Sequence, residues 1–270
     1  MRRPSLLALT VVAAALPALA LASPVTTSVP VPGAFDRVDS RGDFDVEVRE
    51  GTPATIEIVG EPGMAERIEV GLRGTELRLS RKPESEWTRG VVVKVVLPEF
   101  RGLSVGGSGN GKAESGPSPR DVRLAVSGSG SLAWRGAADA LDAAVSGSGS
   151  LRADGPARKL ALAISGSGKG EVQGVSGQAA VNVSGSGDAR IGGRGESLKV
   201  AVAGSGDVDA KGFAARDATV RIAGSGDVEL RLDGGRLDAS IAGSGDVTWT
   251  GEGSLGAVAT AGSGRVRQGR

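Results

Sequence analysis

The chain of 270 residues contains no cysteine, no histidine and no tyrosine. Without cysteine it cannot form disulfide bonds or hold a metal ion through thiolates. Without histidine it lacks the side chain that proteins use most often as a general base and as a metal ligand. These absences argue against an enzyme, and the sequence indicates no catalytic residues, no metal site and no cofactor.

A strong charge of one sign is also absent. Lysine and arginine together number 32, aspartate and glutamate 31, and the formal net charge is +1. Such a balance creates no broad electrostatic field that would attract nucleic acid, so we expect no nucleic-acid partner. Beyond the N-terminal segment no apolar run is long enough to span a bilayer, and no transmembrane span is expected once that segment is removed.

Residues 1–22 have the pattern of a signal peptide. The segment begins with Arg2 and Arg3, continues with an apolar run over residues 6–18, and ends in the small-x-small site Ala20-Leu21-Ala22. A single membrane anchor is the alternative, which the proline inside the apolar run disfavours. We expect export to the periplasm, the outer surface or the extracellular space.

Two segments precede the most regular part of the chain. Residues 23–33 are rich in proline and threonine and predict an extended linker. Residues 34–104 alternate apolar and polar side chains with period two, as Val91, Val93, Val95 and Leu97 do, and predict an N-terminal β region.

A Gly-Ser-Gly triplet then recurs at a nearly fixed interval, so residues 105–270 are predicted to form one repeat array. The steps between successive first glycines are 21, 19, 19, 19, 19, 20, 19 and 19 residues. A register this constant is typical of stacked repeats and not of a flexible linker. The prediction is an all-β fold, a β-solenoid of about nine to ten turns continuous with the N-terminal β region. The first glycines are Gly107, Gly128, Gly147, Gly166, Gly185, Gly204, Gly224, Gly243 and Gly262.

The apolar residues around each triplet share one parity. Leu160, Leu162 and Ile164 precede one triplet at two-residue spacing, and the same parity passes through both of its glycines, Gly166 and Gly168. We therefore expect both glycines to face the interior of a tight bend that admits no side chain. By the same parity Trp134 and Trp249 should lie in the core, whereas Trp87, in a polar loop, should be exposed.

Several of these patterns together resemble a known family. They are Phe35-x-x-Val38, Gly42-x-Phe44-Asp45-Val46-x-Val48 with Gly51, the run from Val91 to Leu97 with Pro98, and Leu103 leading into the triplets. Over about residues 33–264 the chain is similar to the head GIN domain family of "putative auto-transporter adhesins". The resemblance implies an exported bacterial β-solenoid with a role in adhesion, and it brings no catalytic residues with it.

The outward positions at and after the triplets form columns of small polar and acidic side chains. A functional interpretation is a flat ligand face; the alternative is that small polar residues simply fit a tight exposed corner. The aspartates should stack one turn apart, either solvated or compensated by cations or by lysine and arginine. The candidate ligand face comprises Ser129, Ser148, Ser167, Ser186, Ser205, Ser225, Ser244, Asp188, Asp207, Asp227 and Asp246.

Taken together, these features favour an exported, non-enzymatic adhesion or binding module. Its expected partner is a cell-surface glycan or an envelope protein. Two alternatives stay open: a structural scaffold of the cell envelope without a discrete ligand, and a carbohydrate-active β-helix enzyme, which would need an acidic cluster in a groove built from long loops.

The signal-peptide pattern makes a direct prediction. We expect cleavage after Ala22, so the exported protein should begin at Ser23. Intact-mass measurement of the exported chain checks this, and an N-terminus that still carries Met1 would contradict it.

Overall fold

The structure is a computed structural model that describes residues 23–117 and 120–269. The predicted signal peptide, residues 1–22, lies outside the described residues. The described chain is nearly all strand, and its strands form one continuous sheet that winds into about nine turns with a period of about 19 residues. The predicted all-β class and the β-solenoid are thereby confirmed.

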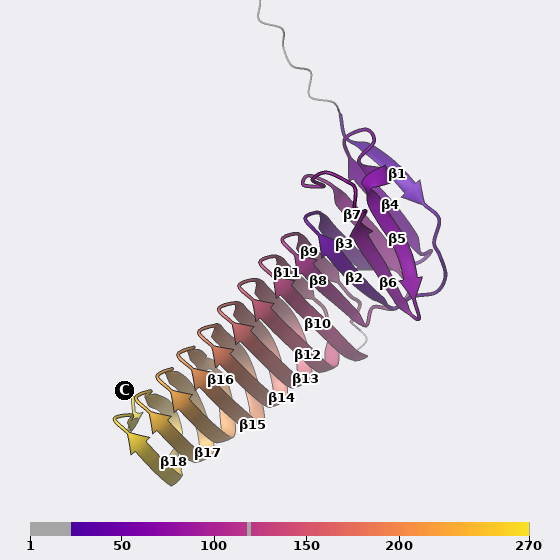
Figure 1. The fold of residues 1–270 in the computed structure, drawn as a ribbon. Helices are drawn as coiled ribbons and strands as arrows, with labels where there is room; N and C mark the ends of the chain where they lie inside the picture. Colours follow the sequence, from indigo (N-terminus) through magenta and orange to yellow (C-terminus); the bar gives the residue numbers. More distant parts are fainter. Residues whose placement is uncertain (1–22, 118–119, 270) are drawn as a thin grey trace, which may run out of the picture.

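The N-terminal part of the described chain forms a broader β region at one end of the rod (Figure 1). It contains parallel and antiparallel pairs, and its one helical element is a single 3-10 turn. Its elements are β1 (Val25–Val29), β2 (Arg37–Gly42), β3 (Asp45–Glu50), β4 (Thr55–Gly60), η1 (Ala65–Arg67), β5 (Ile68–Arg73), β6 (Glu76–Arg81) and β7 (Val92–Leu97).

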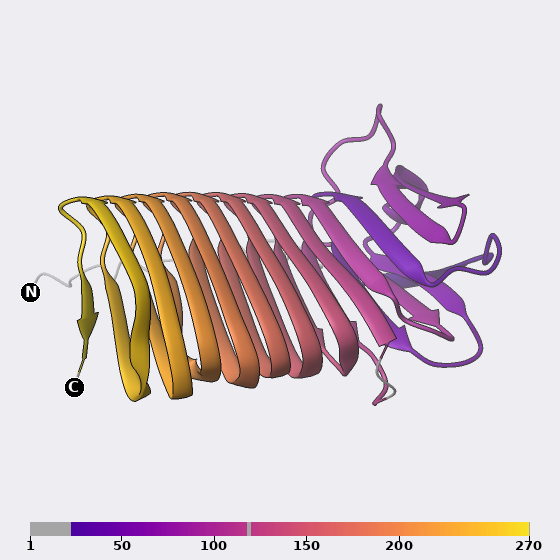
Figure 2. The same cartoon turned by 90° about the horizontal axis from the view of Figure 1, so that it is seen from below.

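The rest of the described chain forms the solenoid, in which each strand pairs in parallel with the strands one turn before and after it (Figure 2). From β13 to β18 one long strand passes around a bend and covers most of a turn. The strands are β8 (Gly102–Gly107), β9 (Asn110–Glu114), β10 (Arg120–Gly128), β11 (Ser131–Arg135), β12 (Ala138–Gly147), β13 (Ser150–Gly166), β14 (Lys169–Gly185), β15 (Asp188–Gly204), β16 (Val208–Gly224), β17 (Val228–Gly243), β18 (Val247–Gly262) and β19 (Val266–Gln268).

The N-terminal β region contributes the first turn of the solenoid. Strand β2 pairs in parallel with β8, which places Gly42 beside Gly107, and β3 pairs in parallel with β9. The stacking therefore begins near residue 37, before the first triplet. Part of the segment interpreted as a linker also belongs to the sheet, because β1 pairs antiparallel with β4.

The core lies where the parity predicts it. Leu160, Leu162 and Ile164 are buried, as are the corresponding residues of neighbouring turns. Trp134 and Trp249 are also buried, and the indole N–H of Trp134 donates to Ser115 Oγ at 3.2 Å. Because each turn contributes only a few apolar side chains, stability depends on continuous backbone ladders as much as on burial.

The two glycines of each triplet have different roles, and the expectation that both face inward is wrong for the first. The first glycine lies outside the core with a positive φ, +113° at Gly185, and a Cβ there would lie 2.6 Å from the carbonyl oxygen of Gly166. The second glycine is buried under the apolar side chain of the previous turn. At Gly168 a Cβ would lie 2.5 Å from Val145 Cγ1.

The positive φ of Gly185 and the carbonyl oxygen beside it predict the effect of adding one methyl group there. Gly185→Ala should lower the free energy of unfolding by about 1–3 kcal/mol, because a side chain at that φ is strained. Gly71→Ala is the control, since a Cβ there meets nothing within 4 Å and its φ is not positive. Urea denaturation followed by circular dichroism checks the pair, and equal midpoints for the two variants would contradict this account of the corner.

Candidate functional site

The predicted serine column lies along the corner edge of the solenoid. All seven predicted triplet serines are exposed. Their backbone amides continue the ladder around the corner: Ser148 N donates to Gly128 O at 2.9 Å and Ser205 N to Gly185 O at 2.8 Å. These bonds use the backbone, so the small exposed hydroxyls are not needed to hold the corner.

Three of the four predicted aspartates take part in the ladder through their side chains. Asp227 N donates to Asp207 Oδ1 at 2.8 Å, and Asp246 N donates to Asp227 Oδ1 at 2.7 Å. The series ends at Arg265, whose amide donates to Asp246 Oδ1 at 2.9 Å. Each carboxylate therefore supplies the acceptor for an amide one turn on, and these hydrogen bonds offset part of the repulsion between stacked charges.

The fourth predicted aspartate, Asp188, follows the pattern of the earlier turns. Its amide donates to the carbonyl oxygen of Gly168 at 3.1 Å, as the amide of Lys169 does to Gly149 at 3.0 Å. Its carboxylate pairs with Lys169 Nζ at 3.5 Å. The column thus contains one aspartate paired with lysine and three that bond backbone amides.

A groove runs beside this column over several turns. We call its wall the charged face, made of the outward residues two and four positions after each triplet serine. One section of about 510 Å³ has a floor that includes Leu151, Gly170 and Ala189. Its polar lining is Ser150, Arg152, Lys169, Glu171, Asp188, Arg190, Asp207 and Asp209.

A second section of about 280 Å³ continues the first, because Asp207 and Asp209 line both. Its other polar lining residues are Asp227, Glu229, Asp246, Thr248 and Arg267. All four predicted aspartates therefore line one groove, whereas the predicted serines lie along the adjacent corner.

The two sections differ in charge. In the first, Arg152 pairs with Asp154 at 2.9 Å and with Glu171 at 2.8 Å. These partners raise the pKa of Arg152, and its hydrogen bond to Asp154 contributes most. The second section is mainly acidic, with Arg267 at 3.8 Å from Asp246. The side chains of these ion pairs are between 29% and 62% exposed, so each pair adds little stability.

Sequence reasoning missed the second column of the charged face. Glu171, Arg190, Asp209 and Glu229 stand four positions after their triplet serines and share the outward parity. Their outward parity is the signal in the sequence that identifies these positions. The sign of the charge changes between turns, however, so no constant residue type marks the column.

Neither a metal centre nor a membrane helix is found in the parts of the chain that the structure describes. Among residues 23–117 and 120–269, no group of three acidic side chains is arranged to hold a metal ion. Within the same ranges, no helix has the length and apolar character needed to cross a bilayer.

The hydrogen bonds of the aspartate column predict a difference between two substitutions. Asp227→Ala should lower the free energy of unfolding by about 0.5–1.5 kcal/mol, because the amide of Asp246 loses its acceptor. Asp227→Asn keeps an oxygen acceptor and removes a like charge, so it should be at least as stable as the parent. Urea denaturation of both variants checks this, and equal losses would show that the bond to Asp246 contributes nothing.

Comparisons with known proteins agree with this architecture. No curated protein matches the chain. A solved structure titled "Putative lipid binding protein" from Parabacteroides distasonis is similar, with a TM-score of 0.67, 20% identity, and coverage of 92% of this chain and 97% of that one. A "putative adhesin" from the same species has a TM-score of 0.64 and 18% identity, covering 92% and 98%. Another from Parabacteroides merdae has a TM-score of 0.66 and 15% identity, covering 92% and 97%.

At these identities the solved structures show a shared fold alone. The family is shown by a family model, which matches residues 34–191 and 169–253 and so covers most of the chain. Its description is "Putative auto-transporter adhesin, head GIN domain". The chain belongs to this family.

Proposed function

We propose that the protein is an exported, non-enzymatic adhesion module whose charged face and serine corner bind a repetitive cell-surface ligand, with a glycan as the ligand class. The observation that carries the proposal is the groove itself, which extends over several turns beside the four aspartates of the candidate ligand face. Membership of an adhesin family supports the adhesive role.

The chemistry of the groove suits a polyhydroxyl chain. Arg152, Lys169 and Arg190 can donate hydrogen bonds, and the neighbouring carboxylates can accept them. A sugar hydroxyl group both donates and accepts, so it has both kinds of partner in the groove. The spacing suits a repetitive ligand, because equivalent groups recur once per turn at ~4.8 Å. Individual contacts at such an exposed surface are weak, and affinity must come from many of them acting together.

Names of similar proteins point in two directions for the ligand. Two of the similar structures are titled as adhesins and one as a lipid-binding protein. We favour the glycan because charged side chains of both signs recur along the groove on successive turns, and such groups suit hydroxyls better than an alkyl chain. An envelope protein as partner and a scaffold without a discrete ligand are the alternatives.

A set of lysine substitutions along the corner tests the proposal. Ser148→Lys, Ser167→Lys, Ser186→Lys and Ser205→Lys together should weaken retention on a glycan surface strongly, and each alone only slightly, because the sites act together. The matched control carries Ala144→Lys, Ala163→Lys, Asn182→Lys and Ala201→Lys, which add the same charge in consecutive turns on the strand before the triplet. Binding to arrays of bacterial and host glycans is the measurement.

The outcomes separate the alternatives. Loss of retention in the corner set and not in the control supports the proposed ligand face. If both fourfold variants stay folded by circular dichroism and bind as the parent does, or if the parent binds no glycan, the scaffold interpretation replaces the proposal. A triple variant, Asp207→Asn, Asp227→Asn and Asp246→Asn, then tells whether the carboxylate charges take part in binding, since asparagine keeps a side-chain oxygen that accepts from the backbone amide.

A further inference from the structure

A second cavity lies at the other end of the molecule, in the N-terminal β region, away from the triplets and the charged face. It has a volume of about 460 Å³. Its walls include the apolar Ala34, Phe35, Ala54 and Pro98 together with the carboxylates of Asp36 and Glu99. A half-open pocket of this volume, with a mainly apolar lining and a few polar groups, falls within the size range of small-molecule sites.

The apolar character continues at the rim of this cavity. Leu72 is 38% exposed, an unusual position for a leucine in this chain. A Cβ at Gly33, which lines the cavity, would lie 2.9 Å from Leu72 Cδ2, so the two residues are in contact. The exposed leucine therefore extends the apolar surface outward from the cavity.

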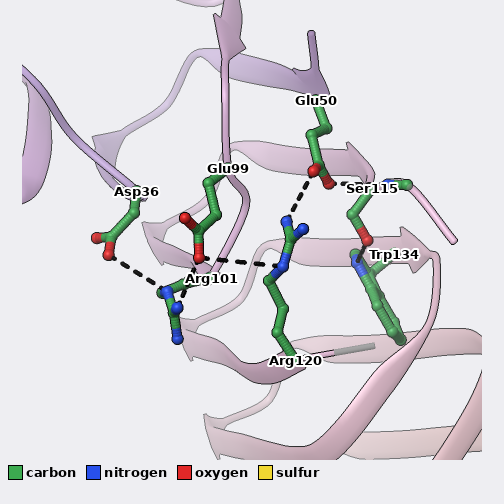
Figure 3. Close-up of polar contacts among 8 residues, drawn as sticks. Asp36, Glu50, Glu99, Arg101, Ser115, Arg120 and Trp134 are labelled. Atoms are coloured by element: carbon green, nitrogen blue, oxygen red, sulfur yellow. Dashed lines mark hydrogen bonds and ion pairs between the residues drawn. The ribbon is translucent and has the colours of Figure 1, made fainter. Parts of the chain in front are cut away.

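The carboxylates of the cavity belong to a chain of ion pairs that joins the N-terminal β region to the solenoid (Figure 3). Arg101 lies 2.6 Å from Glu99 Oε1 and 3.7 Å from Asp36 Oδ2. Arg120 lies 4.0 Å from the same oxygen of Glu99 and 2.7 Å from Glu50 Oε1. Three carboxylates thus share two guanidinium groups, which leaves one negative charge without a counterpart in the cluster.

The unmatched charge is at the cavity. Glu50 is fully engaged, because Gly116 N donates to its second oxygen at 2.8 Å. The carboxylate of Asp36 has only the long contact from its Oδ2 to Arg101, and no group in the described chain donates to its Oδ1, which is buried. Figure 3 shows this second oxygen turned away from Arg101. Both ion pairs of Glu99 use Oε1, so Oε2 is left for another donor. A buried carboxylate oxygen without a donor is costly, and a cationic donor is the partner that relieves the cost best.

We propose that this cavity binds a small amphiphilic amine, with the apolar body between Phe35, Ala54 and Pro98 and the protonated amine beside the carboxylates of Asp36 and Glu99. The side chain of Asp36 is 26% exposed and the residue lines the cavity, so its carboxylate is accessible to a ligand there. This site is independent of the charged face and takes a single molecule per chain.

A series of three matched probes tests the ligand class on the full mature chain. The probes are 2-phenylethylamine, 2-phenylethanol and 3-phenylpropanoate, which share an aromatic body and differ in the charge of the head group. Amide chemical shifts of Gly33, Ala34 and Thr75 are followed by NMR during titration. We expect the amine to bind at least about tenfold more tightly than the alcohol, and the carboxylate to bind least. No binding by any probe, or equal binding by amine and alcohol, would overturn the proposal.

Two substitutions test the site itself. Asp36→Asn should weaken amine binding about tenfold by removing the charge, and should leave the alcohol nearly unchanged. Ala54→Leu should block all three probes by filling the cavity. Glu252→Gln is the control, because it removes an exposed carboxylate from the last turns of the solenoid. If Asp36→Asn fails to fold, Ala54→Leu and the probe series still decide. Unchanged amine binding in a folded Asp36→Asn or Ala54→Leu variant would place the amine elsewhere.

Discussion

The constraint on which the rest of this structure depends is the close approach of backbones at the triplet corner. The amide of each triplet serine donates to the carbonyl of a glycine one turn earlier, at 2.8–3.1 Å in every turn. That carbonyl occupies the space that a side chain on the next first glycine would need, while the second glycine makes room for an apolar side chain of the previous turn. Only glycine meets both demands, so the chain must return to the same corner once per turn.

A fixed corner also fixes every outward position relative to its neighbours. Residues two and four positions after the triplet serine lie directly beside their equivalents in the next turn. Side chains that are 19 or 20 residues apart in sequence therefore form columns along the solenoid. The aspartates of the later turns use this alignment twice. Their Oδ1 atoms accept hydrogen bonds from backbone amides one turn on, and the aspartates also line a groove. Asp207, Asp227 and Asp246 therefore both stabilise the backbone ladder and line the candidate binding surface. Asparagine is the informative substitution there, because it keeps the oxygen that accepts from the amide and removes the charge.

The repeat could be recognised from sequence because period and parity are local signals. They gave the solenoid, the buried positions of Trp134 and Trp249, and the residues of the aspartate column, but other features left no such signal. The first turn, formed by β2 and β3, has Gly42 and Phe44 where later turns have two glycines, so no triplet marks it. Parity also could not tell that the first triplet glycine lies outside the core, because its role comes from a positive φ and from a carbonyl in another turn.

The two proposed sites differ in how they depend on the repeat. Contacts along the charged face recur with every turn, so the strength of binding there should grow with the number of turns that touch the ligand, and a single altered turn matters little. The cavity in the N-terminal β region occurs once, at a junction where Asp36, Glu99 and Arg101 break the regular pattern. Its charge imbalance is local and is not averaged over turns. Removing one carboxylate there abolishes the feature that selects the ligand, whereas removing one on the charged face leaves its equivalents in the neighbouring turns in place.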